Sequence, residues 1–255
     1  MELEHIGLFA DMLPYIGIGF AAQLIDGALG MAFGVICNTL LVGILGMPPA
    51  LASAKVHVVE CFTTASSGIS HLYQRNIDRK LFLGLLVPGV IGGTAGAYLL
   101  TSIDASVVRP FVLGYLTLIG IYLVIKGLRH PGKPRPARHV GPLGLVGGFL
   151  DAAGGGGWGP VVTSNLLVQG VEPRKVIGSV SAVEFFLTIA VSAVFILQIG
   201  IADLVGPTLG LIVGGVIAAP AGAYAARRVA VKPLLTLVGV VLTITSLLGI
   251  WRTFG

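Results

Sequence analysis

The stretch "DAAGGGGWGP", residues 151–160, places four consecutive glycines directly after an acid, within an otherwise apolar region. After proline, glycine is the residue that least favours an uninterrupted helix. A helix that reaches Gly154 is therefore expected to break there. The break needs a reason, because an interrupted backbone in an apolar setting leaves peptide groups without partners.

The remainder of the chain is too apolar for a soluble protein. Of 255 residues, 55% are hydrophobic and 11% are charged, with a mean hydropathy of +0.95. Soluble domains use about a quarter of charged residues. Long apolar runs favour transmembrane helices over the alternating strands of a barrel. The sequence therefore predicts an all-α polytopic membrane protein. The net charge of +5 does not indicate nucleic-acid binding, since the basic residues lie in short loops beside apolar spans.

An internal repeat relates the two halves of the chain. The stretch "GIGFAAQLIDGALGMAFG" (17–34) parallels "GLVGGFLDAAGGGGWG" (144–159), and "GTAGAYLL" (93–100) parallels "APAGAYAA" (219–226). Two acids recur at matching places, Asp26 with Asp151 and Glu60 with Glu184. This order of matches predicts two homologous halves.

The repeat also divides the chain into segments. We expect a first repeat over 1–128, a basic cytoplasmic linker over 129–140 and a second repeat over 141–255. Each repeat holds four helical segments: a long glycine-rich one, near 14–45 and 141–169, and three plain spans. The plain spans are expected near 50–73, 80–100, 107–128, 174–197, 203–225 and 232–251.

The basic residues discriminate between two topologies, because cytoplasmic loops carry an excess of Lys and Arg. If each long segment is re-entrant, only Lys55, Arg109 and Arg252 of the 16 basic residues fall outside. The repeats are then inverted and both termini face outward. Eight full crossings with parallel repeats place only nine of the 16 inside, but stay an alternative. The favoured topology puts these loops in the cytoplasm: 75–80, 126–140, 174–175 and 227–232.

The glycine-rich breaks predict an anion site. A helix that restarts in mid-membrane presents free N–H groups and a positive dipole end. Paired broken segments in two inverted halves mark the central site of many transporters. The expected substrate-binding residues are Gly30, Phe33, Gly34, Asn38, Gly155, Gly156, Gly157, Trp158, Gly159, Thr163 and Asn165. The alternative is that glycines only permit close helix packing. We favour packing for 89–97 and a functional break for 154–159.

Four acids are candidates for proton coupling. Glu60 and Glu184 lie within apolar spans, where ionisable groups are costly and usually functional. A relay through these two and His57 competes evenly with a structural role. Asp26 and Asp151 precede the breaks, where capping of the following half-helix is favoured over coupling. No metal-ligand spacing, phosphate-binding loop, dinucleotide fingerprint or Ser–His–Asp arrangement occurs, so we expect no cofactor, no metal, no catalytic residue and no enzyme.

The stretches "GFAAQLIDGALGMAFG", "SAKVHVVECFTTASSGISHL" and "GTAGAYL", with their echoes "GFLDAAGGGGWGP" and "GSVSAVEFFLT", resemble the TauE/SafE sulfite exporter family, also called the 4-toluene sulfonate uptake permeases. The resemblance implies an inner-membrane transporter of a small sulfur-containing anion such as sulfite, a sulfonate or sulfoacetate. Proton coupling and a homo-oligomer are compatible with it. Lys55 and His57 correspond to Ser179 and Ser181, which favours anion binding on the first half's side. A passive anion channel and a non-transporting scaffold subunit are the competing interpretations.

Overall fold

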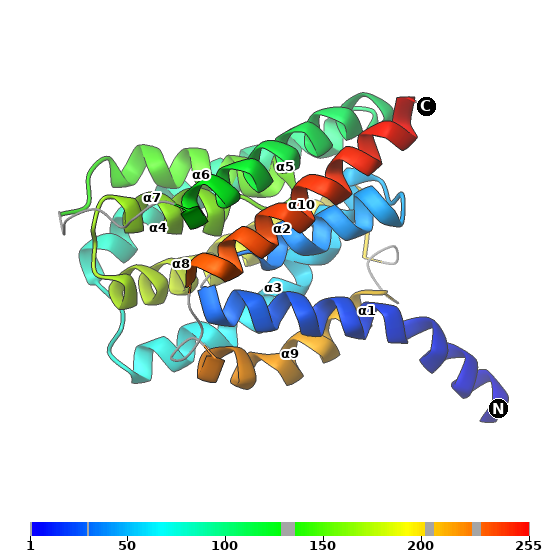
Figure 1. The fold of residues 1–255 in the computed structure, drawn as a ribbon, viewed down its shortest axis with the longest axis horizontal. Coiled ribbons are helices and arrows are strands. Elements are labelled where there is room, and N and C mark those ends of the chain that lie inside the picture. The colour runs from blue at the N-terminus through cyan, green and yellow to red at the C-terminus, as the bar shows by residue number, and fades with distance from the viewer. Residues whose placement is uncertain (1, 30, 129–135, 202–206, 226–230, 255) are drawn as a thin grey trace.

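The structure is a computed structural model that describes the chain except residues 1, 30, 129–135, 202–206, 226–230 and 255. Within the described residues, the regular secondary structure is entirely helical (Figure 1). The prediction of an all-α protein is therefore confirmed for this part of the chain.

Each long glycine-rich segment consists of helical pieces separated by a break. The first contains α1 (Glu2–Leu29), α2 (Phe33–Asn38) and the π-helical turn η1 (Thr39–Ile44). The second contains α6 (Val140–Gly154), the π-helical turn η2 (Trp158–Thr163) and α7 (Ser164–Val168). The expected bounds of the second segment agree closely with these pieces. The first differs, because α1 begins at Glu2 and continues through Pro14.

The plain spans appear as six helices whose bounds lie within a few residues of those expected. They are α3 (Pro49–Tyr73), α4 (Arg79–Ser102), α5 (Ala105–Leu128), α8 (Pro173–Ile199), α9 (Pro207–Ala225) and α10 (Val231–Phe254). Among the described residues, three stretches are long and apolar enough to cross a membrane: Arg79–Ser102, Ser106–Leu128 and Lys175–Ile199. Helix α3 is as long, but Lys55, His57 and Glu60 interrupt its apolar run.

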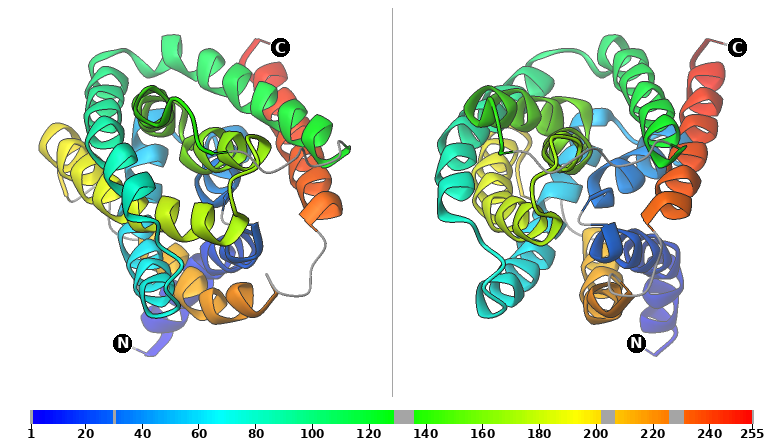
Figure 2. Two further views of the ribbon diagram at one scale, coloured as in Figure 1. Left: turned by 90° about the vertical axis from the view of Figure 1, so that its left-hand side faces the viewer. Right: turned by 60° about the vertical axis from the view of Figure 1, so that its left-hand side comes forward.

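The helices pack in pairs that join distant parts of the chain. Helix α1 packs mainly on α9, α4 on α6, α5 on α10 and α3 on α8. The pairs α1–α9 and α5–α10 can be followed in Figure 1. Each pair takes one helix from either side of the linker, so the two predicted halves are interleaved. Figure 2 shows the shorter pieces α2, α6 and α7 among the long helices.

Glycines let these pairs approach at backbone distance. A Cβ atom at Gly92 of α4 would fall on the carbonyl group of Leu145 in α6. A Cβ atom at Gly214 of α9 would likewise fall on the carbonyl oxygen of Ile16 in α1. No side chain fits at either position, which is how small residues bring membrane helices together. The packing role expected for the glycines of 89–97 is confirmed at Gly92.

Polar contacts tie together the ends of several elements. The backbone N–H of Arg138 donates to Oε1 of Gln169 over 2.6 Å, so the start of α6 lies beside the end of α7. Nearby in the chain, Nζ of Lys175 donates to the carbonyl oxygen of Arg75 over 2.7 Å. This bond joins the start of α8 to the loop between α3 and α4.

A second set of contacts gathers around the end of η1. Nη2 of Arg109 donates to the carbonyl oxygen of Val42 over 3.1 Å, and Nη1 of Arg252 donates to that of Ile44 over 3.4 Å. The last carbonyl groups of a helix have no intrahelical partner and carry a partial negative charge. Two arginines from α5 and α10 therefore satisfy the C-terminal end of the first broken segment.

Candidate functional site between two helix breaks

The second break is made by glycines in conformations that other residues avoid. Helix α6 ends at Gly154, and η2 begins at Trp158. Between them Gly155 has φ = 75° and Gly156 has φ = 126°. A side chain is strongly disfavoured at such positive φ values. The break predicted from "GGGG" is therefore present, and at least two of its glycines are required by the backbone.

The two breaks lie against each other. The Cα atom of Gly156 is 3.2 Å from the position a Cβ atom would take on Gly34, and a Cβ atom on Gly156 would overlap the backbone of Val35. A Cβ atom on Gly159 would lie 2.6 Å from Cβ of Met31. These contacts bring residues 31–35 of the first segment onto residues 156–159 of the second. In this arrangement, main chain meets main chain.

Asp151 caps the second break. Its Oδ1 atom accepts the backbone N–H of Gly157 over 2.8 Å and that of Trp158 over 3.0 Å, and the residue is 3% exposed. Asp26 does the same at the first break, where its Oδ1 atom accepts the N–H of Phe33 over 3.2 Å. These bonds bear out the capping interpretation. The sequence predicts Phe33, Gly157 and Trp158 as part of an anion site. In the structure their backbone N–H groups are bound to the protein's own carboxylates.

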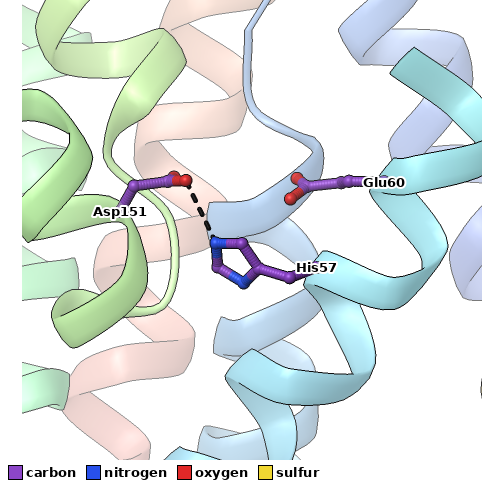
Figure 3. Close-up of side chains that lie close together, drawn as sticks. All are labelled: His57, Glu60 and Asp151. Carbon is purple, nitrogen blue, oxygen red and sulfur yellow. Dashed lines mark hydrogen bonds and ion pairs between the residues drawn. The ribbon is translucent and has the colours of Figure 1, made fainter. Parts of the chain in front are cut away.

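His57 joins this arrangement from α3. Its Nε2 atom lies 3.1 Å from Oδ2 of Asp151 (Figure 3). Its Nδ1 atom lies 2.8 Å from the carbonyl oxygen of Ser53. The hydroxyl group of Ser53 donates to the carbonyl oxygen of Ala152 over 2.9 Å, so it offers Nδ1 only an acceptor. Nδ1 therefore carries a proton.

The contact between His57 and Asp151 holds a second proton. An imidazole nitrogen and a carboxylate oxygen at 3.1 Å attract each other only with a proton between them. Two amides donate to the other oxygen of Asp151, which favours the ionised carboxylate. The geometry is therefore that of an imidazolium–aspartate ion pair, buried in the protein.

Glu60 extends the cluster. It is 3% exposed, and one ligand-capable atom each of His57, Glu60 and Asp151 lies within 4.8 Å of the others. Figure 3 shows both carboxyl groups beside the imidazole ring. The distances would suit a metal ion, because Nδ1 of His57 faces a carbonyl oxygen and leaves Nε2 toward Asp151; the same contacts also suit a shared proton.

The four candidate acids lie near one another, although only Glu60 and Asp151 meet at His57. Glu60 interacts electrostatically with Asp151, Glu184 and Asp26, and Glu184 interacts with both aspartates. They come from α1, α3, α6 and α8, so the site draws on both predicted repeats. The sequence named these residues, but their convergence depends on the packing of α3 against α8 and on the contact between the breaks.

The other expected residues take several positions. Trp158 is fully buried and donates from Nε1 to the carbonyl oxygen of Val180 over 3.1 Å, so it packs inside the protein. Asn38 lies against the second break, near Gly155. Asn165 is exposed and bonds to its own segment at Val161, away from the buried cluster. The rest are placed as follows: Phe33, Lys55 and Thr163 are buried, and Gly30 lies outside the described residues.

Two further residues contact the site without having been expected. Ser53 precedes His57 by four positions, so helical spacing put it on the same face of α3. Tyr115 of α5 donates to the carbonyl oxygen of Gly156 over 3.3 Å; its ring lies against Gly154 and its hydroxyl oxygen against Gly157. Nothing in the sequence singles out Tyr115 from the apolar span that contains it.

Apolar helices around buried charged groups define a polytopic membrane protein with a polar centre. The family described as "Sulfite exporter TauE/SafE" matches residues 15–248. A curated protein of Bacillus subtilis (strain 168), "Probable membrane transporter protein YtnM", is 40% identical over 226 residues, covering 85% of this chain and 75% of the relative. No solved structure matches.

The chain therefore belongs to the TauE/SafE sulfite exporter family. It is a membrane transporter rather than an enzyme.

Proposed function

We propose that the protein is a secondary transporter that moves a small sulfur-containing anion, such as sulfite or a sulfonate, across the cytoplasmic membrane together with protons. The observation that carries the proposal is the buried cluster of His57, Glu60 and Asp151 where the two breaks meet, with the half-buried Asp26 and Glu184 close enough to interact with it electrostatically. The substrate class follows from the family, whose description names sulfite.

The polar contacts support inverted, re-entrant segments. The bond between Arg138 and Gln169 brings the two ends of the second segment together, as a hairpin requires. The bond from Lys175 to Arg75 joins two loops that both face the cytoplasm in the re-entrant topology. Eight full crossings would put these two loops on opposite sides of the membrane. A two-fold axis relating inverted halves also explains why α1–α9 mirrors α6–α4.

The cluster supports proton coupling. Unlike a pair of surface acids, the four carboxyl groups interact across a low-dielectric interior, where repulsion between like charges is strong. His57 supplies one positive charge to Asp151, and the carboxyl group of Glu60 lies beside the same imidazole ring. Intramembrane carboxyl chains of this kind serve as proton relays in transporters.

The first experiment is uptake of labelled sulfite, followed by a sulfonate panel, into proteoliposomes with and without an imposed pH gradient. We expect saturable uptake that follows the gradient. Flux that ignores the gradient would instead indicate a channel or uniporter. No flux for any of these anions would remove the proposed substrate class.

The coupling role is tested by Glu184→Gln, which we expect to abolish the response to the gradient while the protein still inserts. Glu172→Gln is the matched control, since Glu172 is an exposed residue at the start of the same helix. A full response retained in Glu184→Gln would exclude this carboxyl group from the coupling.

A further inference from the structure

The carboxylate of Asp151 is held as a bound anion would be. One oxygen accepts two backbone N–H groups, from Gly157 and Trp158, and the other faces Nε2 of His57. The side chain is 5% exposed, so it is almost entirely shielded from bulk solvent. Three donors thus converge on one buried O–C–O group, at the point where the two breaks touch.

We call these three donors, the N–H groups of Gly157 and Trp158 and Nε2 of His57, the cradle. We propose that this cradle is the substrate's own oxyanion site and that Asp151 occupies it while no substrate is bound. This inference rests on the proposed function. The cradle selects an anion with two oxygens on one central atom, one to accept the two amides and one to accept the imidazolium. Sulfite and sulfonate groups present such an O–S–O edge. The substrate binds by replacing the Asp151 carboxylate.

The replacement of the Asp151 carboxylate by the substrate sets how many protons enter with each anion. A charged carboxylate leaving His57 and the amides would be a buried charge without a partner, which is very costly. Asp151 therefore leaves as the neutral acid, with a proton on its carboxyl group. One monoanion and one proton enter together, and the total charge of the cluster does not change. Transport by this route is electroneutral for a monoanion.

The surrounding titratable groups are consistent with this exchange. Helix α3 presents His57 and Glu60 to Asp151, α5 presents Tyr115 and α8 presents Glu184. Helix α4, which packs along α6, carries charged residues only in its exposed first turn, and η2 and α7 carry none. His57 is thus the cation that remains in the cradle when Asp151 leaves.

The equivalent position in the first half is not equipped in the same way. Among the described residues Asp26 accepts the N–H of Phe33, and Ser181 stands at the place that corresponds to His57. A serine supplies no positive charge. The exchange is therefore assigned to Asp151 alone.

The test removes the internal anion. In the purified full-length protein, Asp151→Ala leaves the amides and His57 without an acceptor, so we expect a lower Tm than wild type. Formate or acetate should restore it, with a Tm rise of about 3 to 6 °C at tenfold the dissociation constant. Wild type should not respond. Asp78→Ala is the matched control, because Asp78 also accepts two N–H groups through one oxygen, but on an exposed loop.

A Tm response that is absent in Asp151→Ala, or equal in the Asp78 control, would overturn the proposal. If Asp151→Ala does not fold, the nearly isosteric Asp151→Asn carries the test by uptake. We expect its uptake to lose the response to the pH gradient and to depend on membrane potential instead. Retained proton drive would overturn the exchange while leaving the proposed function intact. Conversely, failure of wild type to transport any sulfur anion would leave the formate result unaffected.

Discussion

Gly156 is the residue on which the contact between the breaks depends. Its φ of 126° suits glycine, and its Cα atom lies where the first break comes closest. An added methyl group would meet the backbone of Val35 and would also be strained by the main-chain conformation.

We therefore expect Gly156→Ala to destabilise the protein by about 1 to 3 kcal/mol and to reduce uptake in proteoliposomes. Gly114→Ala is the control, since Gly114 lies within α5 with open space around it. Replacing a helical glycine with alanine there should be neutral or stabilising by up to about 1 kcal/mol. Thermal unfolding of both variants checks the difference, and equal Tm values would contradict it.

The site was predictable at single residues but not as a cluster. Asp151 before four glycines already indicated a cap, because an acid at a helix restart accepts free N–H groups. The contact of Asp151 with His57 could not be predicted from the sequence, since 94 residues separate the two and the repeat matches Asp151 with Asp26. Only the packing of α3 beside the break brings the imidazole to the carboxylate. Sequence spacing also missed Tyr115 for this reason.

At the scale of elements, helix α1 presents two glycines with opposite surroundings. A Cβ atom on Gly19 would fall on the carbonyl oxygen of Leu211 in α9, whereas none of the described atoms lies within 4 Å of one on Gly17. Both positions are inside the same helix, so the intrinsic helical preference is the same.

The pair gives a clean test of helix packing. We expect Gly19→Ala to separate α1 from α9 and lower the Tm, with a cost of about 1 to 3 kcal/mol for overpacking. Gly17→Ala should leave the Tm unchanged or slightly higher. Unfolding of the two purified variants measures the difference. A lower Tm in Gly17→Ala than in Gly19→Ala would show that α9 does not lie against this face.

Helix positions followed from the sequence because apolar runs and polar loops alternate clearly. The start of α1 did not, since the expected start at residue 14 coincides with a proline and the helix continues through it. Membrane helices tolerate proline where neighbouring groups satisfy the freed carbonyl. The partners of the helices could not be read from the chain, because the apolar faces of membrane helices resemble one another.

At the scale of the whole molecule, the topology makes a prediction about sidedness. In the re-entrant arrangement Arg138 and Glu172 flank one hairpin and face the same side, with Asp104 on the opposite side. Single cysteines at the three positions, in a chain whose Cys37 and Cys61 are replaced, should label accordingly with an impermeant thiol reagent. We expect Arg138→Cys and Glu172→Cys to react from the cytoplasmic side and Asp104→Cys from outside. Opposite labelling of the first two would establish a full crossing.

The packing of α1 on α9 has a consequence for how the protein is made. About 180 residues separate the end of α1 from the start of α9, which at 5 to 20 residues per second is about 10 to 40 s of synthesis. During that time the glycine face of α1 has no helix to receive it, and in the earlier part of it, before residues 155–157 are made, α2 has no second break to rest on. The nascent first half therefore lies in the bilayer without its packing partners until the second half is made. Its final shape is set only when the second half is inserted beside it.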